Sequence, residues 1–205
     1  NAAAKSLQKL GVEVCLNAKV TDCNEQGIVI GDELIPVGTI VWAAGVQASP
    51  AAQWLGVESD RAGRVKVAAD FSVPAHEGVF VIGDTAAQTD AAGKPVPGVA
   101  QGAIQGGDHV AAIIRAQITG SSMPAPFRYR NLGNMATIGR YAAVADFSFL
   151  RMKGGLAWWL WGAVHIAFLI GFRNRLAVML QWLWSFLTYK RGVRLITGMF
   201  SRKLA

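Results

Sequence analysis

The chain has 205 residues, 52% of them hydrophobic and 16% charged, a composition that excludes an intrinsically disordered segment. Its formal net charge is +7, but Asp146 is the last acidic residue, so the positive charge gathers in the C-terminal tail. Long apolar blocks rich in Trp separate the basic residues of this tail, which favours an anionic lipid surface over a nucleic acid as partner. Cys15 and Cys23 have no metal-ligand spacing, so we expect no metal site and a reduced, cytoplasmic setting.

The chain begins without Met, inside a helical pattern, so we expect it to start within a domain. Gly11 ends the predicted helix, and Val12 to Val14 begin a predicted strand. Further on, Gly31-Asp32 joins two short apolar runs and predicts a hairpin turn.

The run TIVWAAG, residues 39–45, predicts an apolar strand that ends in small residues. Ala44 and Gly45 would let the backbone approach a flat ligand closely, because no bulky side chain stands in the way. A simple turn at this point is an equally good interpretation.

The middle of the chain predicts alternating strands, loops and one long helix. The predicted elements are a strand at 64–67, an apolar strand at 79–84, a helix at about 99–118, and strands with turns at Gly133 and Gly139. The basic, apolar tail covers residues 151–205.

The strand VFVIGD, residues 79–84, ends in a carboxylate. Buried parallel strands are continuously apolar, and ligands of α/β proteins bind beyond their carboxyl ends. Asp84 at such a tip either caps a helix or binds a ligand hydroxyl, and the residues alone leave both open.

The stretch GRVKVAADFSVPAHEGVFVIGD resembles the second flavin-binding signature of flavoproteins with two dinucleotide-binding folds. IVWAAGVQASP resembles the preceding motif of that family, where the chain returns from the NAD(P)H domain to the FAD domain. The resemblance implies that FAD binds at Gly83, Asp84, Ala44 and Gly45, with Asp84 accepting hydrogen bonds from the ribityl chain.

Ala100, Gln101 and Gln105 on the next helix resemble the quinone-site motif of type II NADH dehydrogenases. Gln101, Gln105 and His109 share one helix face, and amide side chains can bind a quinone carbonyl without a protonation step. A polar helix face with no ligand is the plainer alternative. The resemblance extends the FAD site to Ala100 and Gln101, and implies a quinone site at Gln101, Gln105, Ile138 and Gly139.

The family resemblance implies an α/β fold: the C-terminal part of a flavoprotein with two dinucleotide-binding domains, including part of its Rossmann-like FAD domain. Residues 1–45 would end the NADH domain, residues 46–118 would be the returning part of the FAD domain, and residues 119–205 would form a small domain with strands. The glycine-rich phosphate loops of the family do not occur in the sequence, so we expect them upstream and expect this chain alone to be inactive. No catalytic residue is assigned, because FAD would carry the redox chemistry between NADH and quinone.

The tail from about residue 156 to 205 predicts amphipathic membrane-binding helices. Residues 154–172 carry no formal charge, which is close to the length of a membrane span. However, the polar residues of the second block fall on one narrow stripe, which favours a helix lying in the membrane interface; they are Asn174, Gln181, Ser185 and Thr188. Arg173, Arg175, Lys190 and Arg191 bracket this block and could meet anionic headgroups. His165 could serve quinone protonation, but as a lone histidine in an apolar stretch it is interpreted as a polar contact to neighbouring backbone.

The resemblance implies a peripheral protein on the cytoplasmic face of the inner (plasma) membrane, with a homodimer as an open possibility. Sulfide:quinone oxidoreductase shares the architecture, but it needs redox cysteines near the flavin, and Cys15 and Cys23 precede the return motif. A non-catalytic membrane-associated binding module and a soluble flavin reductase are further alternatives. The apolar tail argues against the soluble reductase.

Overall fold

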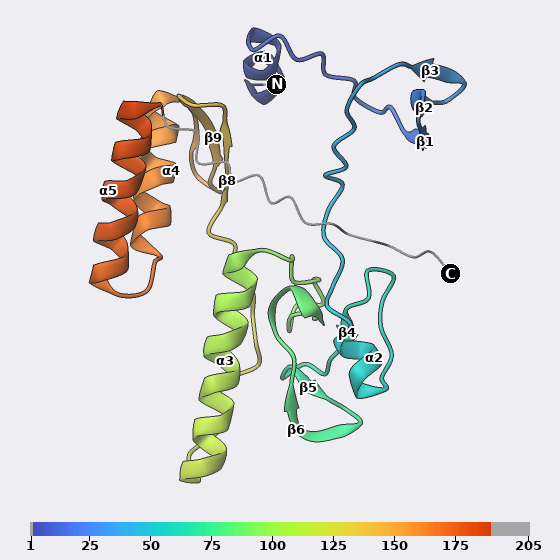
Figure 1. The fold of residues 1–205 in the computed structure, drawn as a ribbon. Coiled ribbons are helices and arrows are strands. Elements are labelled where there is room, and N and C mark those ends of the chain that lie inside the picture. Colours follow the sequence, from blue (N-terminus) through green and yellow to red (C-terminus); the bar gives the residue numbers. More distant parts are fainter. Residues whose placement is uncertain (1, 190–205) are drawn as a thin grey trace. The chain divides into compact units, whose positions relative to one another are not determined.

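The computed structural model describes residues 2–189 and divides the chain into two compact units. The central unit comprises residues 15–132, and the terminal unit combines residues 1–14 with residues 133–205. Figure 1 shows both as mixtures of helices and short strands. The predicted α/β fold is thus confirmed, while the predicted domain boundaries at residues 45 and 118 stay predictions.

The central unit begins with a three-stranded antiparallel sheet in the order β1-β2-β3. Its strands are β1 (Val20–Asn24), β2 (Gly27–Ile30) and β3 (Glu33–Ile35). β2 and β3 are joined by the predicted two-residue turn, in which Gly31 has a φ of 65°, a conformation that glycine adopts readily. The hairpin is therefore confirmed. The strand predicted at Val12 to Val14 is wrong, because these residues pair with no strand in the described part of the chain.

The apolar strand predicted at residues 39–45 is also wrong. The segment belongs to no helix or strand, and its Val41 and Trp42 side chains are 83% and 69% exposed. An apolar strand forms only between neighbouring strands that accept its hydrogen bonds and cover its side chains. No strand within residues 2–189 fills that role for this segment.

The next part of the central unit is built from short elements. They are α2 (Ala51–Leu55), β4 (Val65–Lys66), β5 (Ser72–Val73), β6 (His76–Phe80), the 3-10 turn η1 (Gly83–Thr85) and β7 (Ala86–Ala87). β4 pairs in parallel with β7, and it lies inside the strand predicted at residues 64–67. β5 and β6 form an antiparallel pair.

The strand predicted at residues 79–84 differs from the structure in its end point and its partner. β6 ends at Phe80 and runs antiparallel to β5, and residues 83–85 already form η1. The physical reason is local, because Gly83 has a φ of 66°, which turns the chain out of the extended conformation. Asp84 therefore lies in a tight turn and not at the tip of a long strand.

α3 (Ala100–Thr119) matches the predicted helix to within one residue at each end. It ends at Gly120, which has a left-handed backbone conformation and donates its N–H to the Ala116 carbonyl. The buried face of α3 contributes to a core cluster that consists of Phe71, Val96, Val110 and Phe127. A second cluster, comprising Ala52, Val65 and Val73, lies between α2 and the short strands.

The terminal unit is a small antiparallel sheet covered by helices. It contains α1 (Ala2–Lys9), β8 (Asn134–Ile138), β9 (Ala142–Asp146), β10 (Arg151–Gly154), α4 (Gly155–Ala167) and α5 (Phe172–Thr188). The sheet has the order β10-β9-β8, with the predicted turn at Gly139 between β8 and β9. The fully buried Ala143, Ala145 and Ala157 let α4 pack closely on β9. β10 lies at the start of the predicted tail and was not anticipated.

The two C-terminal helices pack on each other, as Figure 1 shows. The Trp161 and Trp182 rings stack with centroids 5.4 Å apart. The His165 ring contacts the Trp161 backbone carbonyl at 2.7 Å, which confirms the interpretation of His165 as a polar contact to backbone.

Residues 168–171 separate the helices, so the uncharged stretch 154–172 is not one continuous helix. Among residues 2–189, no helix has both the length and the apolar character needed to cross a membrane. The predicted headgroup contacts Lys190 and Arg191 lie outside the described residues.

Candidate functional site

Asp84 is held at the surface of the central unit by η1. Its side chain is exposed and lies beside Gly98: a Cβ built on Gly98 would be 3.4 Å from Asp84 Oδ1. The helix-capping alternative does not hold, because the N-cap residues of η1 and α3 are Ile82 and Val99. The carboxylate is therefore available to accept hydrogen bonds from a molecule that approaches the start of α3.

Small residues bring η1 and the first turns of α3 into close contact. A Cβ on Gly83 would lie 3.2 Å from the Ala103 Cβ. A Cβ on Gly102 would lie only 2.7 Å from the Pro97 carbonyl oxygen, so a larger residue could not fit there without movement. Through this packing Asp84 is fixed beside the N-terminus of the 20-residue helix α3.

Ala100 and Gln101 form the first turn of α3, as the sequence predicted. The N-terminus of a helix carries partial positive charge and presents backbone N–H groups toward an anionic or polar ligand. A carboxylate beside such a terminus makes a mixed site, with an acceptor at Asp84 and donors in the first turn. This combination suits a ligand that carries both hydroxyl groups and negative charge.

Ala44 and Gly45 are exposed residues in the segment that leads from β3 to α2. The chain contacts η1 a few residues after Gly45, through a hydrogen bond between the Ser49 and Thr85 hydroxyls, which are 3.3 Å apart. A cavity of about 360 Å³ beside Ser49 is lined by Gln47, Ala48, Ser49, Pro50, Ala52, Gln53, Ser59 and Gly63. The structure thus connects the neighbourhood of Gly45 to the turn that carries Asp84 through one side-chain contact.

Gln101 and Gln105 both bind backbone of the segment that follows the loop after α3. Gln105 Nε2 donates to the Arg130 carbonyl at 2.9 Å, and Gln105 Oε1 accepts from the Arg130 N–H at 2.9 Å. Gln101 Oε1 accepts from the Leu132 N–H at 3.0 Å. Sequence reasoning placed the two amides on one helix face but missed these partners, which are 25 to 31 residues away.

His109 is half-buried and packs against the core of the central unit. Its ring is tilted against Phe71 and Phe127, with centroid distances of 6.1 and 5.4 Å. Burial lowers the pKa of His109 from 6.5, and the Asp70 carboxylate partly opposes that effect. The imidazole is therefore held toward its neutral form by apolar packing.

Ile138 and Gly139 lie in the terminal unit, at the turn between β8 and β9. Ile138 pairs with Ala142, and Gly139 adopts a φ of 67°. A Cβ on Gly139 would be 3.3 Å from the Leu10 Cδ1 atom. Leu10, which directly follows α1, therefore packs against this turn, and a side chain at residue 139 would need Leu10 to move.

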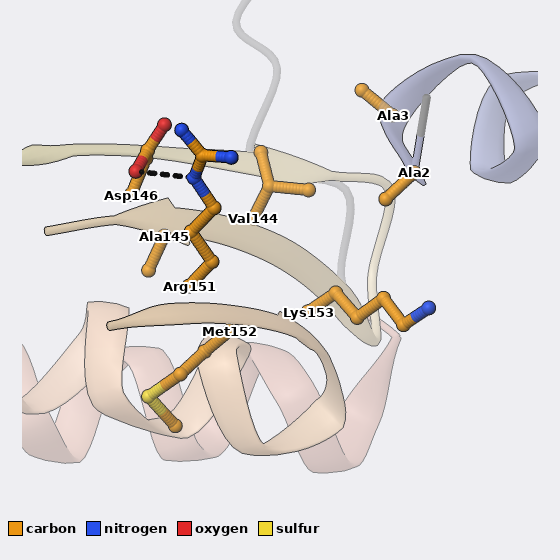
Figure 2. Close-up of a pocket in the computed structure, with 8 residues that line it drawn as sticks. All are labelled: Ala2, Ala3, Val144, Ala145, Asp146, Arg151, Met152 and Lys153. Atoms are coloured by element: carbon orange, nitrogen blue, oxygen red, sulfur yellow. Dashed lines mark hydrogen bonds and ion pairs between the residues drawn. The ribbon is translucent and has the colours of Figure 1, made fainter. Parts of the chain in front are cut away.

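The terminal unit also contains an open groove of about 630 Å³ between α1 and β9–β10, which Figure 2 shows. Its lining consists of Ala2, Ala3, Val144, Ala145, Asp146, Arg151, Met152 and Lys153. Arg151 Nε donates to the Asp146 carboxylate at 3.0 Å, so one of the two cations in the lining is already paired. None of the predicted site residues lines this groove, so it is separate from the predicted chemistry.

Two protein families match the chain in sequence. The profile of the family described as Pyridine nucleotide-disulphide oxidoreductase matches residues 1–107, and the NDH2 C-terminal domain matches residues 131–190. The fold and the first match define the class, and the chain belongs to the pyridine nucleotide-disulphide oxidoreductase family. Within that class it belongs to the type II NADH dehydrogenases, as the second match and the similarity to two mycobacterial proteins show. The resemblance seen in the sequence is therefore confirmed.

The two relatives from Mycobacterium tuberculosis (strain ATCC 25618 / H37Rv) are named type II NADH:quinone oxidoreductase Ndh and NdhA. They are 45% and 43% identical over 95% and 96% of this chain. An internal alternative NAD(P)H-ubiquinone oxidoreductase A1 from Arabidopsis thaliana is 31% identical over 90% of this chain. The chain spans 43% of the length of each mycobacterial relative and 39% of the plant one.

A solved structure has the same fold. It is described as NDH2 from Plasmodium falciparum in complex with NADH, and it superposes with a TM-score of 0.78 at 15% sequence identity. The match covers 94% of this chain and 55% of the other.

Proposed function

We propose that the whole protein is a non-proton-pumping NADH:quinone oxidoreductase and that this chain supplies its FAD-facing and quinone-facing parts. The names of the relatives support the activity, and the NADH bound in the related Plasmodium falciparum structure supports the electron donor. The observation that carries the proposal is the exposed Asp84 carboxylate, fixed next to Gly98 at the start of α3.

The residues present fit FAD. The missing side chain of Gly98 leaves room beside Asp84 Oδ1, so a ribityl hydroxyl could donate to that oxygen without a steric clash. The first turn of α3, with Ala100 and Gln101, would hold an anionic part of the cofactor, because a helix N-terminus favours negative charge. Gly83, Ala44 and Gly45 would border the cofactor as residues without bulky side chains.

When bound, FAD supplies the redox chemistry that links hydride acceptance from NADH to reduction of a quinone by two electrons. The residues of this chain bind and orient: Asp84 holds a hydroxyl, and the N-terminus of α3 stabilises negative charge. Gln101 and Gln105 of the central unit are proposed to serve quinone binding, and Ile138 and Gly139 of the terminal unit are proposed quinone residues in their own right. Residues 1–45 would complete the NADH domain, residues 46–118 the FAD domain, and residues 119–205 a C-terminal domain.

The helix pair α4 and α5 supports peripheral attachment to a membrane that contains the quinone. Large apolar side chains cover its surface, among them Trp159 at 65% exposure and Phe172 at 79%. Exposed apolar area of this kind favours burial in an interface, with Arg173 and Arg175 near anionic headgroups. We place the protein on the cytoplasmic face of the inner membrane.

The alternatives have less support. A sulfide:quinone oxidoreductase would need cysteines beside the flavin, whereas Cys15 and Cys23 are exposed and come before residue 39. A non-catalytic binding module would not account for Asp84 together with relatives named as oxidoreductases.

Flavin retention tests the proposal. In the whole protein, Asp84→Ala should weaken FAD binding roughly tenfold to a hundredfold, because a charge-assisted hydrogen bond contributes about 1.5–3 kcal/mol. Asp108→Ala is the matched control, since Asp108 is an exposed carboxylate further along α3. Flavin absorbance after dilution and gel filtration gives the occupancy of each variant. Equal occupancy in the two variants would remove the support that Asp84 gives to the proposal.

A further inference from the structure

Residues 127–132 run along α3 without belonging to a helix or a strand, as Figure 1 shows. Backbone groups need hydrogen-bond partners even where no sheet supplies them. Here the Phe127 carbonyl accepts from the Ala91 N–H at 2.9 Å, and the Asp90 carboxylate accepts from the Tyr129 backbone. Side chains of α3 supply partners for backbone groups of Arg130 and Leu132.

The three hydrogen bonds that join the Gln101 and Gln105 side chains to the backbone of Arg130 and Leu132 form what we call the glutamine ladder. Its spacing has a simple geometric reason. Residues i and i+4 of a helix are about 6 Å apart along the axis, and two residues of extended chain cover about 6.6 Å. Two glutamines one turn apart can therefore reach alternate backbone N–H groups of a chain that runs antiparallel to the helix.

We propose that Gln101 and Gln105 are positioning residues, and that they influence quinone binding by holding residues 130–132 against α3. Leu132 is the last residue of the central unit, and β8 begins two residues later and ends at Ile138. The ladder thus fixes the last residues of the central unit on α3, and the second group of predicted quinone residues follows in the chain. The quinone part of this inference rests on the proposed function, whereas the ladder itself does not.

Direct contact between the amides and the quinone is the competing explanation. A glutamine amide has two N–H donors and an oxygen with two lone pairs. The bonds with Arg130 use one donor and one lone pair of Gln105. The two explanations differ in what happens when the ladder is broken at its backbone end, with both glutamines intact.

Hydrogen exchange at single residues tests the ladder in the whole protein. Gln105→Met removes both bonds at similar side-chain length, so the Arg130 amide should exchange roughly tenfold faster. Gln105→Glu keeps an acceptor for the Arg130 N–H and should preserve most of its protection. Gln117→Met is the control, because Gln117 is an exposed glutamine on the same helix. An Arg130 amide that exchanges equally fast in Gln105→Met and Gln117→Met overturns the ladder.

Steady-state kinetics with a water-soluble quinone separates positioning from direct contact. Arg130→Pro removes the backbone N–H and leaves Gln105 in place, and Arg130→Ala controls for the lost charge. Positioning predicts that Arg130→Pro and Gln105→Met each raise the quinone KM roughly fivefold to tenfold, and that the double variant shows no further rise. Arg130→Ala should leave both the quinone KM and flavin reduction by NADH unchanged.

Two results would overturn positioning in favour of direct contact. One is a rise in the quinone KM for Gln105→Met but not for Arg130→Pro. The other is a double variant in which the fold-increases in KM of the two single variants multiply. The pair Leu132→Pro and Gln101→Met repeats the test at the other end of the ladder if Arg130→Pro does not fold. If the whole protein reduces no quinone, the proposed function fails, and the exchange rates of Arg130 and Leu132 still decide whether the ladder exists.

Discussion

The glycines of α3 differ in how much room surrounds them. A Cβ on Gly102 would meet the Pro97 carbonyl oxygen at 2.7 Å and Val96 Cγ1 at 3.1 Å. A Cβ on Gly107 would find only Ile82 Cδ1, at 3.6 Å, which is an ordinary contact. The two positions therefore offer a matched pair of substitutions within one helix.

We expect Gly102→Ala to lower the free energy of unfolding by about 1–3 kcal/mol, because the added methyl forces Pro97 away from α3. Gly107→Ala should raise it by about 0.5–1 kcal/mol, since alanine is the better helix former and has space. Denaturant unfolding of both variants measures the difference. A Gly102→Ala protein as stable as Gly107→Ala would contradict the close approach of residues 96–97 to α3.

The packing of His109 between Phe71 and Phe127 predicts a pH dependence of stability. Burial lowers the folded-state pKa of His109 below 6.5, so the unfolded state binds the proton more readily. The stability that neutral His109 contributes to the folded state is fully present above pH 6.5. It is lost as the pH falls from the unfolded-state pKa through the lower folded-state pKa.

The wild type should therefore be less stable at a pH below 6.5 than at a pH above it, and His109→Phe should show a smaller difference. Comparing each protein with itself at the two pH values cancels the change in side-chain volume. Parallel pH profiles for the two proteins would show that His109 is not buried as described.

At the scale of secondary structure, Arg140 ties the turn between β8 and β9 to the end of α5. Its Nη2 donates to the Ser185 carbonyl at 3.5 Å and also to the Phe186 carbonyl. Its guanidinium carbon lies 3.7 Å from the centroid of the Tyr189 ring, and the Tyr141 and Tyr189 hydroxyls are 3.0 Å apart. A cation at the C-terminus of a helix stabilises it through the last carbonyls and the helix dipole.

Arg140→Met should therefore loosen the last turn of α5, with faster hydrogen exchange there and a loss of about 1–3 kcal/mol in stability. Arg173→Met is the control, because Arg173 stands in the first turn of the same helix, where a positive charge is unfavourable. Unchanged exchange at the end of α5 in Arg140→Met would rule out this role.

The elements that the sequence predicted well are those defined by neighbouring residues. The hairpin at Gly31-Asp32, the helix α3 and the turn at Gly139 each depend on signals a few residues apart. The failures depend on distant partners: the apolar run at residues 39–45 is not a strand, because no described strand pairs with it. Likewise Gly83 could be read as the end of a strand, although its positive φ starts a turn.

At the scale of the whole molecule, the local features of the candidate site could be predicted from the sequence, whereas its contacts between distant residues could not. The face shared by Gln101 and Gln105 follows from helical spacing, whereas their bonds to Arg130 and Leu132 leave no trace in the sequence pattern. Asp84 could be singled out by its position after an apolar run. Its place beside Gly98 depends on the packing of η1 against α3 and is visible only in the structure.

Anaerobic stopped-flow absorbance of the bound flavin in the whole protein tests the central claim most directly. NADH should reduce the flavin in the first half-reaction, and a quinone should reoxidise it in the second. A folded protein that purifies without flavin, or a flavin that NADH reduces and a quinone leaves reduced, would contradict the assignment of this chain to the FAD-facing and quinone-facing parts of such an enzyme.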